Sequence, residues 1–256
     1  MAVASTAIVA PGASVPADVT VGHYAVIHEG VELGTGTVIG DHAVVGVPAG
    51  DEAPLRVGPR STIRSHTVLY AGSDLGERFE TGHHALVRAG ARTGVNFRLG
   101  SYSSLEGEVV AGDYVRIHGY TQVGNGSRIG DFAWIYSLCT LTNDPLPPSS
   151  LFEPVVVGDA AVVCPSATLM PGCRVGRGAF VAAGALVSGD VPDGAVVSPD
   201  GRVSGRVDRL MNLASGLRHP WLRHFTEAYP EDARARLASL RDEILAACKK
   251  VTAGDG

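Results

Sequence analysis

The sequence contains little cysteine, few aromatic residues and few charges. Only four of its 256 residues are cysteine, and no two have the spacing of a disulfide pair or a zinc-binding pair. A disulfide framework and a metal centre are therefore not expected, and a reducing cytoplasm is the expected compartment. Aromatic residues make up 6% of the chain and charged residues 18%, which argues against a core of bulky rings.

Other features that the sequence lacks exclude two classes of partner. The net charge of -5 at pH 7 gives no electrostatic reason to expect binding to nucleic acid or to an anionic membrane. No apolar run is long enough to span a bilayer. The N-terminal stretch "MAVASTAIVAPGASV" has no basic residues at its start and continues directly into the repeat described next, so we interpret it as structure and not as a signal peptide.

A six-residue repeat dominates what is present. An aliphatic residue recurs every six positions, first at Val9, Val15, Val21, Ile27, Leu33, Ile39 and Val45, and again from Val57 to Ile135. This period is neither the 3.6 of a helix nor the 2 of a plain strand. It fits a short strand followed by a tight corner, three of which close a triangular coil of 18 residues. The aliphatic residues would point inward, and the frequent glycines would suit corners with positive φ.

The stretch "LTNDPLPPSS" interrupts this repeat. The phase restarts at Val157, which is 22 residues after Ile135 and therefore out of register, so 141–154 is interpreted as an insertion. A loop of this length is usually functional, and its prolines limit the entropy lost when it is ordered. Because Asn143 and Asp144 offer hydrogen-bond donors and acceptors, we expect the loop to build a pocket against a rigid wall.

The C-terminal part has a different pattern. Leu237, Leu240, Ile244 and Cys248 have helical spacing, and Pro230-Glu231-Asp232 is typical of a helix start. Two or three helices are expected after about residue 205. The predicted organisation is a β-helix domain over 1–200, with the inserted loop 141–154, and a helical segment over 205–250.

His118 is the histidine with the most unusual position in the repeat. It follows an aliphatic residue, in the slot that Gly82 and Gly100 occupy in the coils below, and Tyr136 lies one coil above it. An imidazole with a reference pKa near neutrality suits a general base, whereas a tolerated surface histidine is the alternative.

Two further candidates, His84 and Glu106, occupy other positions in the repeat. His84 and His66 are 18 residues apart and should stack at one corner, with Tyr102 and Tyr120 continuing the column. A simple corner role is the plainer interpretation of His84, and substrate binding is the other. Glu106 lies on a different side of the coil from His118 and faces either a neighbouring subunit or solvent.

The hexapeptides "VGHYAV", "IGDHAV", "IGDFAW" and "VGRGAF" resemble those of the hexapeptide-repeat acyltransferases. The resemblance covers about residues 7–197. Those proteins fold as left-handed parallel β-helices, so the resemblance implies an all-β fold of that kind with a C-terminal α-helical appendix.

The segments "GDYVRIHGYTQVG", "TNDPLPP" and "VGDAAVVCPSATLMPGC" are similar to one branch of that family. That branch acetylates amino groups of nucleotide-linked amino-deoxysugars, with acetyl-CoA as the donor. The resemblance implies a homotrimer with active sites between subunits, His118 as the catalytic residue, and an acceptor site that includes the loop residues. It further implies a CoA groove lined by Ser166, Arg177, Ala182, Ala183 and Gly184.

The size of several wall residues also favours a trimer. Side chains that are large for a face exposed to solvent include Tyr102, Tyr120, Trp134 and Tyr136.

The candidates for substrate binding are Asn143, Asp144, Glu106, Tyr136 and His84.

Three alternative functions remain open at the level of sequence. An O-acetyltransferase acting on a hydroxyl acceptor cannot be separated from an N-acetyltransferase. A metal enzyme of the γ-carbonic-anhydrase kind would need a third histidine where Val123 stands. A non-enzymatic β-helix scaffold would use its C-terminal helices for docking.

Overall fold

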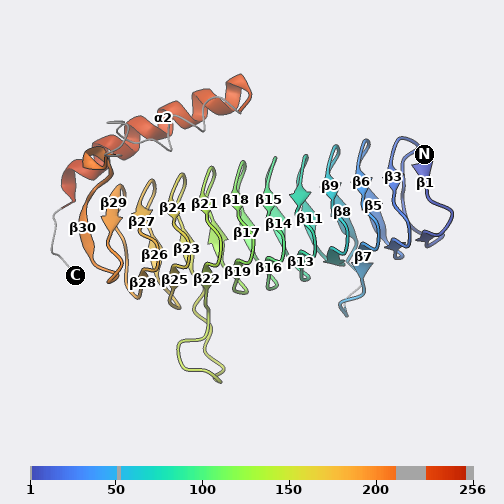
Figure 1. Ribbon diagram of the computed structural model, residues 1–256, viewed down its shortest axis with the longest axis horizontal. Helices are drawn as coiled ribbons and strands as arrows, with labels where there is room; N and C mark the ends of the chain where they lie inside the picture. Colours follow the sequence, from blue (N-terminus) through green and yellow to red (C-terminus); the bar gives the residue numbers. More distant parts are fainter. Residues whose placement is uncertain (1, 51–52, 212–228, 252–256) are drawn as a thin grey trace.

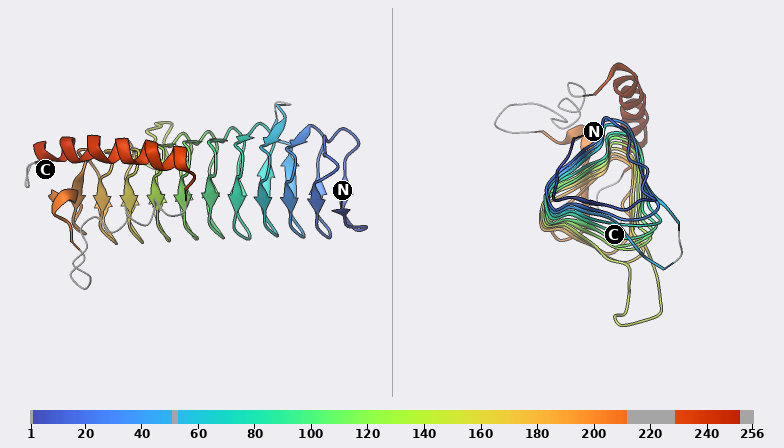
Figure 2. Two further views of the ribbon diagram at one scale, coloured as in Figure 1. Left: turned by 90° about the horizontal axis from the view of Figure 1, so that it is seen from above. Right: turned by 90° about the vertical axis from the view of Figure 1, so that its right-hand side faces the viewer.

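The computed structural model describes residues 2–50, 53–211 and 229–251, and these form a left-handed parallel β-helix of about 11 turns (Figure 1). Seen along its axis, the β-helix has a triangular outline, and helix α2 lies at one corner while a long loop projects from another (Figure 2). The predicted all-β architecture is therefore confirmed.

Three sheets form the three faces, and all their strand pairs are parallel except the last, β29 with β30. Sheet A contains β1 (Ala2–Val3), β3 (Thr20–Val21), β6 (Val38–Ile39), β9 (Thr62–Ile63), β12 (Glu80–Thr81), β15 (Arg98–Leu99), β18 (Arg116–Ile117), β21 (Trp134–Ile135), β24 (Val162–Val163), β27 (Phe180–Val181), β29 (Ala195–Val197) and β30 (Val203–Arg206). Sheet B contains β2 (Ile8–Val9), β4 (Val26–Ile27), β7 (Val44–Val47), β10 (Val68–Tyr70), β13 (Leu86–Val87), β16 (Ser104–Leu105), β19 (Gln122–Val123), β22 (Thr140–Leu141), β25 (Thr168–Leu169) and β28 (Leu186–Val187). Sheet C contains β5 (Val31–Leu33), β8 (Leu55–Val57), β11 (Asp74–Leu75), β14 (Arg92–Thr93), β17 (Val110–Ala111), β20 (Arg128–Ile129), β23 (Val156–Val157) and β26 (Arg174–Val175).

The six-residue period places alternate strand residues inside and outside the coil. In the two-residue strands of sheet A from β3 to β27, the second residue points inward; Leu99 and Ile117, for example, are 1% and 2% exposed. The residue before it points outward, as in Arg98 and Arg116. Because successive coils pair at a spacing of 18 residues, for example Arg98 with Arg116, equivalent residues form straight columns along the helix.

The three corners carry different kinds of residue, and we name them by the sheets that they join. The A–B corner includes 82–84, 100–102, 118–120 and 136–138; the B–C corner includes 88–90, 106–108 and 124–126; the C–A corner includes 94–96, 112–114 and 130–132. The last residue of each corner often has positive φ, as in His84 and Tyr102, with φ of 55° and 58°. Polar or aromatic side chains at these positions therefore point out of the coil.

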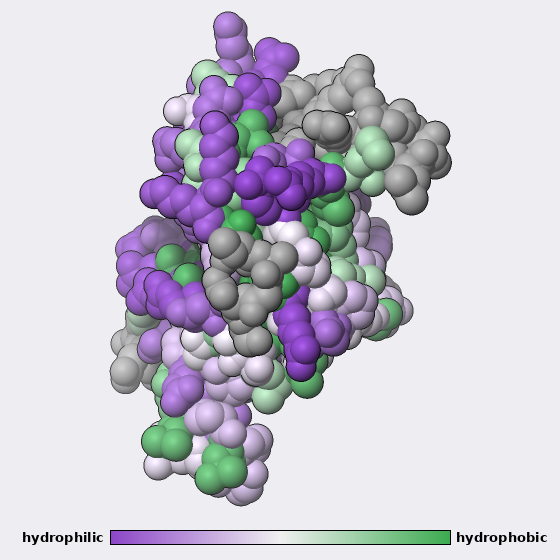
Figure 3. Space-filling model, turned by 90° about the vertical axis from the view of Figure 1, so that its left-hand side faces the viewer, coloured by the Kyte–Doolittle hydropathy of each residue, from purple (hydrophilic) through white to green (hydrophobic). Residues whose placement is uncertain are grey.

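The predicted insertion is visible in the strand register. Ile117 pairs with Ile135 at the usual spacing, whereas Ile135 pairs with Val163, a spacing of 28 residues instead of 18. The added residues leave the B–C corner after β22 and project away from the β-helix (Figure 1). Figure 3 shows apolar surface on this projection, which agrees with the exposure of Leu146, Leu151 and Phe152.

The C-terminal segment packs on the C–A corner and on part of sheet A. A short 3-10 helix, η1 (Val207–Arg209), follows the last strand, and helix α2 (Glu231–Ala247) ends in η2 (Cys248–Lys250). Helix α2 is the one α-helix among the described residues. Residues 212–228, which belong to the predicted helical segment, are not among the described residues. Leu237 and Ile244 are buried in a cluster that also contains Tyr114 and Phe132 from the C–A corner.

Ion pairs reinforce this contact between α2 and the β-helix. Arg236 bonds Asp113 at 2.8 Å and also bonds Asp131, one coil further on.

The division into a domain over 1–200 and a segment over 205–250 remains a prediction.

Replacing Leu237 with alanine should loosen α2 and leave the β-helix folded. Leu237 is 2% exposed, and truncation of a buried leucine typically costs about 2–5 kcal/mol. We expect faster amide hydrogen exchange over 231–247 with an unchanged β-sheet signal by circular dichroism, because the coils stack on one another without α2. Ser239→Ala, an exposed position of the same helix, serves as the control, and loss of the β signal in Leu237→Ala would contradict the expectation.

Candidate functional site

A cleft of about 500 Å³ lies on the outer face of sheet A and contains His118. We call it the His118 cleft. Its charged, polar and aromatic lining residues include Arg64, Glu80, Asn96, Arg98, Arg116, Trp134 and Tyr229.

His118 stands at the end of β18, where sheet A turns into the A–B corner. Its ring stacks on Tyr136 one coil above, with ring centres 4.6 Å apart, and lies 5.7 Å from the Trp134 ring. The backbone is held by a bond from His118 N to Ile135 O at 2.8 Å and by one from Ser103 Oγ to His118 O at 2.9 Å. Burial lowers the pKa of His118 below its ordinary value, so the imidazole is neutral near pH 7.

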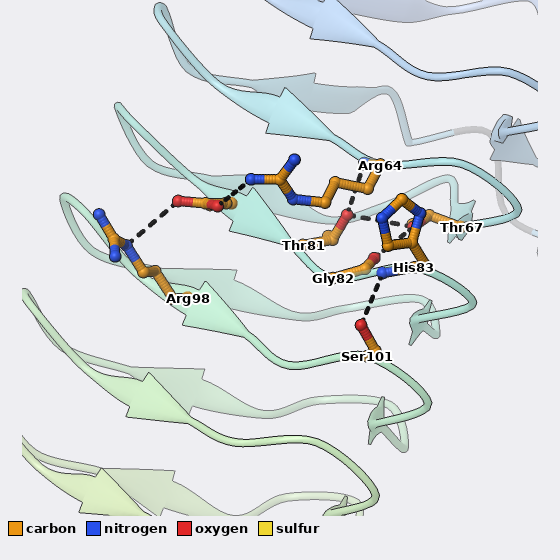
Figure 4. A network of polar contacts seen from close by, with 8 residues as sticks. Arg64, Thr67, Thr81, Gly82, His83, Arg98 and Ser101 are labelled. Atoms are coloured by element: carbon orange, nitrogen blue, oxygen red, sulfur yellow. Dashed lines mark hydrogen bonds and ion pairs between the residues drawn. The ribbon is translucent and has the colours of Figure 1, made fainter.

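Three arginines make the His118 cleft positively charged. Arg64 Nη2 and Arg98 Nε both bond the carboxylate of Glu80, at 2.7 and 3.2 Å. Figure 4 shows the guanidinium groups of Arg64 and Arg98 on either side of the carboxylate that both contact (Figure 4). With Arg116 added, three guanidinium groups face one carboxylate, which leaves two net positive charges in the lining.

The sequence interpretation missed these arginines, although a signal was present. Arg98 and Arg116 each precede an inward aliphatic residue and are 18 positions apart, which places them in one outward column. Tyr229 had no such signal, because it reaches the cleft only through the docking of the C-terminal segment.

The inserted loop borders a second and larger cleft, of about 1020 Å³, at the B–C corner. We call it the loop cleft. Glu106, Asn143 and Asp144 line it together, and Arg88 Nη1 lies 3.8 Å from the Glu106 carboxylate. None of the described residues lines both this cleft and the His118 cleft. Within one chain, the loop and His118 therefore cannot contact the same atom.

Hydrogen bonds inside the loop use the carboxylate of Asp144. It accepts bonds from Leu146 N at 3.0 Å, from Ser149 N at 2.9 Å and from Ser149 Oγ at 2.6 Å. The bonds from Ser149 lower the pKa of Asp144. The carboxylate thus organises the loop, and its role in substrate binding remains a prediction. Among the described residues, the side chain of Asn143 makes a single long contact, 3.5 Å from Nδ2 to Asn125 O, so its amide is the freer group.

Four of the five predicted CoA-groove residues lie along the A–B corner. Ser166 and Gly184 are exposed corner residues with φ of 62° and 71°, and Ala182 and Ala183 precede Gly184. Gly184 N donates to Pro165 O at 2.9 Å, so these residues sit on adjacent coils.

Arg177 lies elsewhere, at the C–A corner. Its guanidinium bonds Asp193 at 2.9 Å and Glu243 of α2 at 3.0 Å. These two partners hold the side chain against the helix, so a role in the CoA groove remains a prediction that this geometry does not support.

His84 belongs to a column of stacked rings on the A–B corner. The column runs through Tyr24, His42, His66, His84, Tyr102 and Tyr120, with neighbouring ring centres 4.5 to 5.1 Å apart. The predicted stacking of His66 and His84 is confirmed. His84 lies two coils below His118, and its binding role remains a prediction.

The wall residues cited in favour of a trimer do not all face solvent. Tyr102 and Tyr120 are 52% and 60% exposed. Trp134 and Tyr136 are half-buried, because each contacts His118 and Trp134 also packs against the cluster under α2. The expectation of an exposed wall is therefore wrong for these two residues.

Two of the cysteines lie in the core of the β-helix. Cys139 and Cys173 are 1% and 2% exposed, and burial raises the pKa of Cys173 to about 11. Across residues 2–50, 53–211 and 229–251, no three His, Cys, Asp or Glu side chains are grouped so that they could hold a metal ion. In the same ranges, no helix combines the length and apolar character needed to cross a bilayer.

Comparison with known proteins gives a local sequence match and a match of fold. No protein-family model matches the chain. A segment of 52 residues is 50% identical to 2,3,4,5-tetrahydropyridine-2,6-dicarboxylate N-acetyltransferase from Staphylococcus aureus strain JH9, and the same identity holds for the protein of strain Newman. The segment is 20% of this chain, and the chain spans only 21% of the length of those relatives.

Among solved structures, UDP-N-acetylglucosamine acyltransferase from Arabidopsis superposes with a TM-score of 0.54 at 15% identity, over 98% of this chain and 97% of that one. This likeness concerns the fold alone. By its repeat and its fold, the chain is a hexapeptide-repeat protein of the left-handed β-helix class.

Proposed function

We propose that the protein transfers an acyl group from acyl-CoA, foremost acetyl-CoA, to an amino group of a nucleotide-linked amino-deoxysugar. One observation carries the proposal: a neutral imidazole, His118, lies in a positively charged cleft of a size suited to a small molecule. The resemblance of the segments around His118, the loop and the later coils to nucleotide-amino-sugar N-acetyltransferases supports the same assignment. The local match to an N-acetyltransferase from Staphylococcus aureus supports acyl transfer to nitrogen.

His118 is the proposed general base. Among the described residues, neither ring nitrogen has a hydrogen-bond partner, so one of them is available to accept a proton. The amine nitrogen would attack the thioester carbonyl and lose a proton to His118. The carbon–sulfur bond then breaks, and the CoA thiolate leaves and takes up a proton.

Gly119 offers a donor for the oxyanion that forms during this attack. At the equivalent position two coils below, His83 N donates to Ser101 Oγ at 3.0 Å (Figure 4). The N–H of Gly119 has no such acceptor in the part of the chain that the structure describes, and Gly119 lines the His118 cleft. An unpaired N–H beside the base is well placed to stabilise a developing negative charge.

The A–B corner beyond His118 fits an extended donor. Ser166, Ala182, Ala183 and Gly184 are small, and the exposed Leu138 and Leu186 flank them, at 58% and 54%. A narrow pantetheine arm could lie along such a corner without displacing bulky side chains. We therefore assign the donor to this corner.

The loop would reach the acceptor from a second copy of the chain. Since the loop cleft and the His118 cleft share no lining residue within the described chain, a common acceptor site needs an adjacent subunit, as in the proposed homotrimer. Asn143 would then bond the acceptor, while Asp144 keeps the loop in shape. Light scattering that finds a monomer at micromolar concentration would contradict this arrangement.

The function is tested by measuring CoA release with acetyl-CoA and a panel of acceptors. The panel contains nucleotide-linked amino-deoxysugars, the same amino sugars without the nucleotide, a cyclic dicarboxylate imine or amine, and plain sugars with hydroxyl acceptors only. Release with the first group alone supports the proposal. Release with the plain sugars would instead identify an O-acetyltransferase, and a melting temperature unchanged by acetyl-CoA would contradict CoA binding.

The pH dependence of the reaction should carry the signature of His118. Its ordinary pKa of 6.5 is lowered by burial, and only the neutral form can accept a proton. We expect kcat/KM, calculated for the unprotonated form of the acceptor amine, to fall on acidification with a midpoint below about 6.5. An acid limb that persists unchanged in His118→Gln would assign the titration to another group.

A further inference from the structure

No carboxylate of the described residues contacts the guanidinium of Arg116, and Glu80 acts on its charge only from a longer distance. Its guanidinium bonds Asn96 O, Asn96 Oδ1 at 3.1 Å and Val115 O at 3.0 Å, all of which are neutral acceptors. No carboxylate of residues 2–50, 53–211 or 229–251 forms an ion pair with it, whereas Arg64 and Arg98 share Glu80. Half-burial of a guanidinium without a carboxylate is unfavourable unless something else supplies the negative charge.

Tyr229 presents a second unsatisfied group at the same end of the His118 cleft. The residue is 5% exposed, and its buried hydroxyl oxygen has no hydrogen-bond partner among the described residues. A buried hydroxyl in this state is rare and costs stability. The ring is fixed from three sides, by Tyr114 and Phe132 at 4.9 and 5.8 Å and by the Arg116 guanidinium 5.6 Å from its centre.

The two groups come from parts of the chain that are far apart in sequence. Arg116 is the outward residue of β18 and directly precedes the inward Ile117, after which His118 follows. Tyr229 immediately precedes the proline before α2, so it is positioned by the docking of that helix. The C-terminal segment thus forms one wall of the cleft in which the proposed base lies.

We propose that Arg116 and the Tyr229 hydroxyl form a subsite for an acidic group, a phosphate or a carboxylate, of the molecule bound in the His118 cleft. The guanidinium supplies the counter-charge. A small shift of the Tyr229 side chain would let its hydroxyl, which is closed to solvent in this structure, donate a hydrogen bond to an acceptor oxygen, so that the ligand satisfies both groups at once. Arg64 and Arg98, which Glu80 neutralises only in part, extend the positive lining toward the N-terminal coils. The identity of this molecule as the acyl acceptor rests on the proposed function, whereas the binding of an acidic group does not.

Binding to the full-length protein tests the subsite directly. Inorganic phosphate and malonate are titrated by calorimetry into the wild type, Arg116→Gln, Arg116→Lys and Tyr229→Phe. We expect Arg116→Gln to weaken binding of the preferred anion about tenfold or more, Arg116→Lys to restore part of it, and Tyr229→Phe to weaken it several-fold. The probe that binds the wild type more tightly distinguishes a phosphate from a carboxylate ligand.

Matched controls separate this effect from general charge and folding. Arg92→Gln removes an exposed arginine from sheet C, and Tyr120→Phe removes an exposed hydroxyl from the A–B corner; both should bind as the wild type does. The inference is overturned if neither anion binds the wild type, or if folded Arg116→Gln binds both anions unchanged.

Kinetics distinguish a failure of the subsite from a failure of the proposed reaction. With an active acceptor, Arg116→Gln should raise the acceptor KM by more than it lowers kcat, and the KM for acetyl-CoA should not change. An unaltered acceptor KM would overturn the subsite and leave acyl transfer standing. Weakened anion binding in a protein that releases no CoA with any acceptor would support the subsite and reject the proposed reaction.

Discussion

His118→Ala should lower kcat about a hundredfold or more, with little change in the KM for acetyl-CoA. The substitution removes the proposed proton acceptor and leaves intact the later coils of the A–B corner, where the donor is assigned. Single-turnover measurement of CoA release at saturating donor and acceptor isolates the chemical step.

A matched substitution shows whether the loss is specific. His23→Ala removes another A–B corner histidine, one that bonds Thr6 Oγ1 at 2.9 Å in the first coils and lies far from the cleft along the axis. It should keep the wild-type kcat. A drop of less than tenfold in His118→Ala would mean that the amine attacks without loss of a proton to the enzyme, and His118 would then only position the acceptor.

Gly100→Ala should impair both stability and catalysis. A Cβ built at Gly100 would lie 2.3 Å from Gly119 N and 2.4 Å from the carbonyl carbon of His118, and both are backbone atoms. The coil that carries His118 must therefore move, at a cost of about 1–3 kcal/mol. Because a displacement of about 1 Å near the reacting atoms can cost a hundredfold in rate, we expect kcat to fall by a similar factor.

Thermal unfolding and kinetics of Gly100→Ala are compared with those of Gly189→Ala. At Gly189 no heavy atom lies within 4 Å of an added Cβ, so this variant should melt and react as the wild type does. A Gly100→Ala protein with wild-type melting temperature and kcat would show that the two coils can separate without disturbing His118.

The β-helix was predictable from the sequence because its core residues recur with a short period of six positions. Inward residues such as Leu99 and Ile117 recur at a fixed spacing, and any change of phase, as after Ile135, reveals an insertion. The contact between the rings of His66 and His84 was predicted from their spacing of 18 residues, which is one coil.

The candidate site was less predictable because outward positions follow no hydrophobic pattern. The column of Arg98 and Arg116 has the repeat spacing, yet nothing in the repeat requires arginine there. Arg177 was assigned to the CoA groove by resemblance, whereas its partner Glu243 depends on where α2 docks. Tyr229 reaches the cleft through the same long-range contact, and no local pattern encodes it.

Helix α2 also changes how the β-helix should unfold. Coils of a solenoid contact only their neighbours, so each coil can normally open with little effect on distant ones. Along its length, α2 touches the coil of Tyr114 at one end and, through Cys248 of η2, the coil of Gly194 at the other. Helix α2 therefore links the C-terminal coils, so that they unfold together as one cooperative unit. The N-terminal coils have no such link and can unfold separately. Amide protection should accordingly rise in a single step near residue 113. His118 and Arg116 lie on the protected side of that step, whereas Arg64, Glu80 and Arg98 of the same cleft lie on the other side.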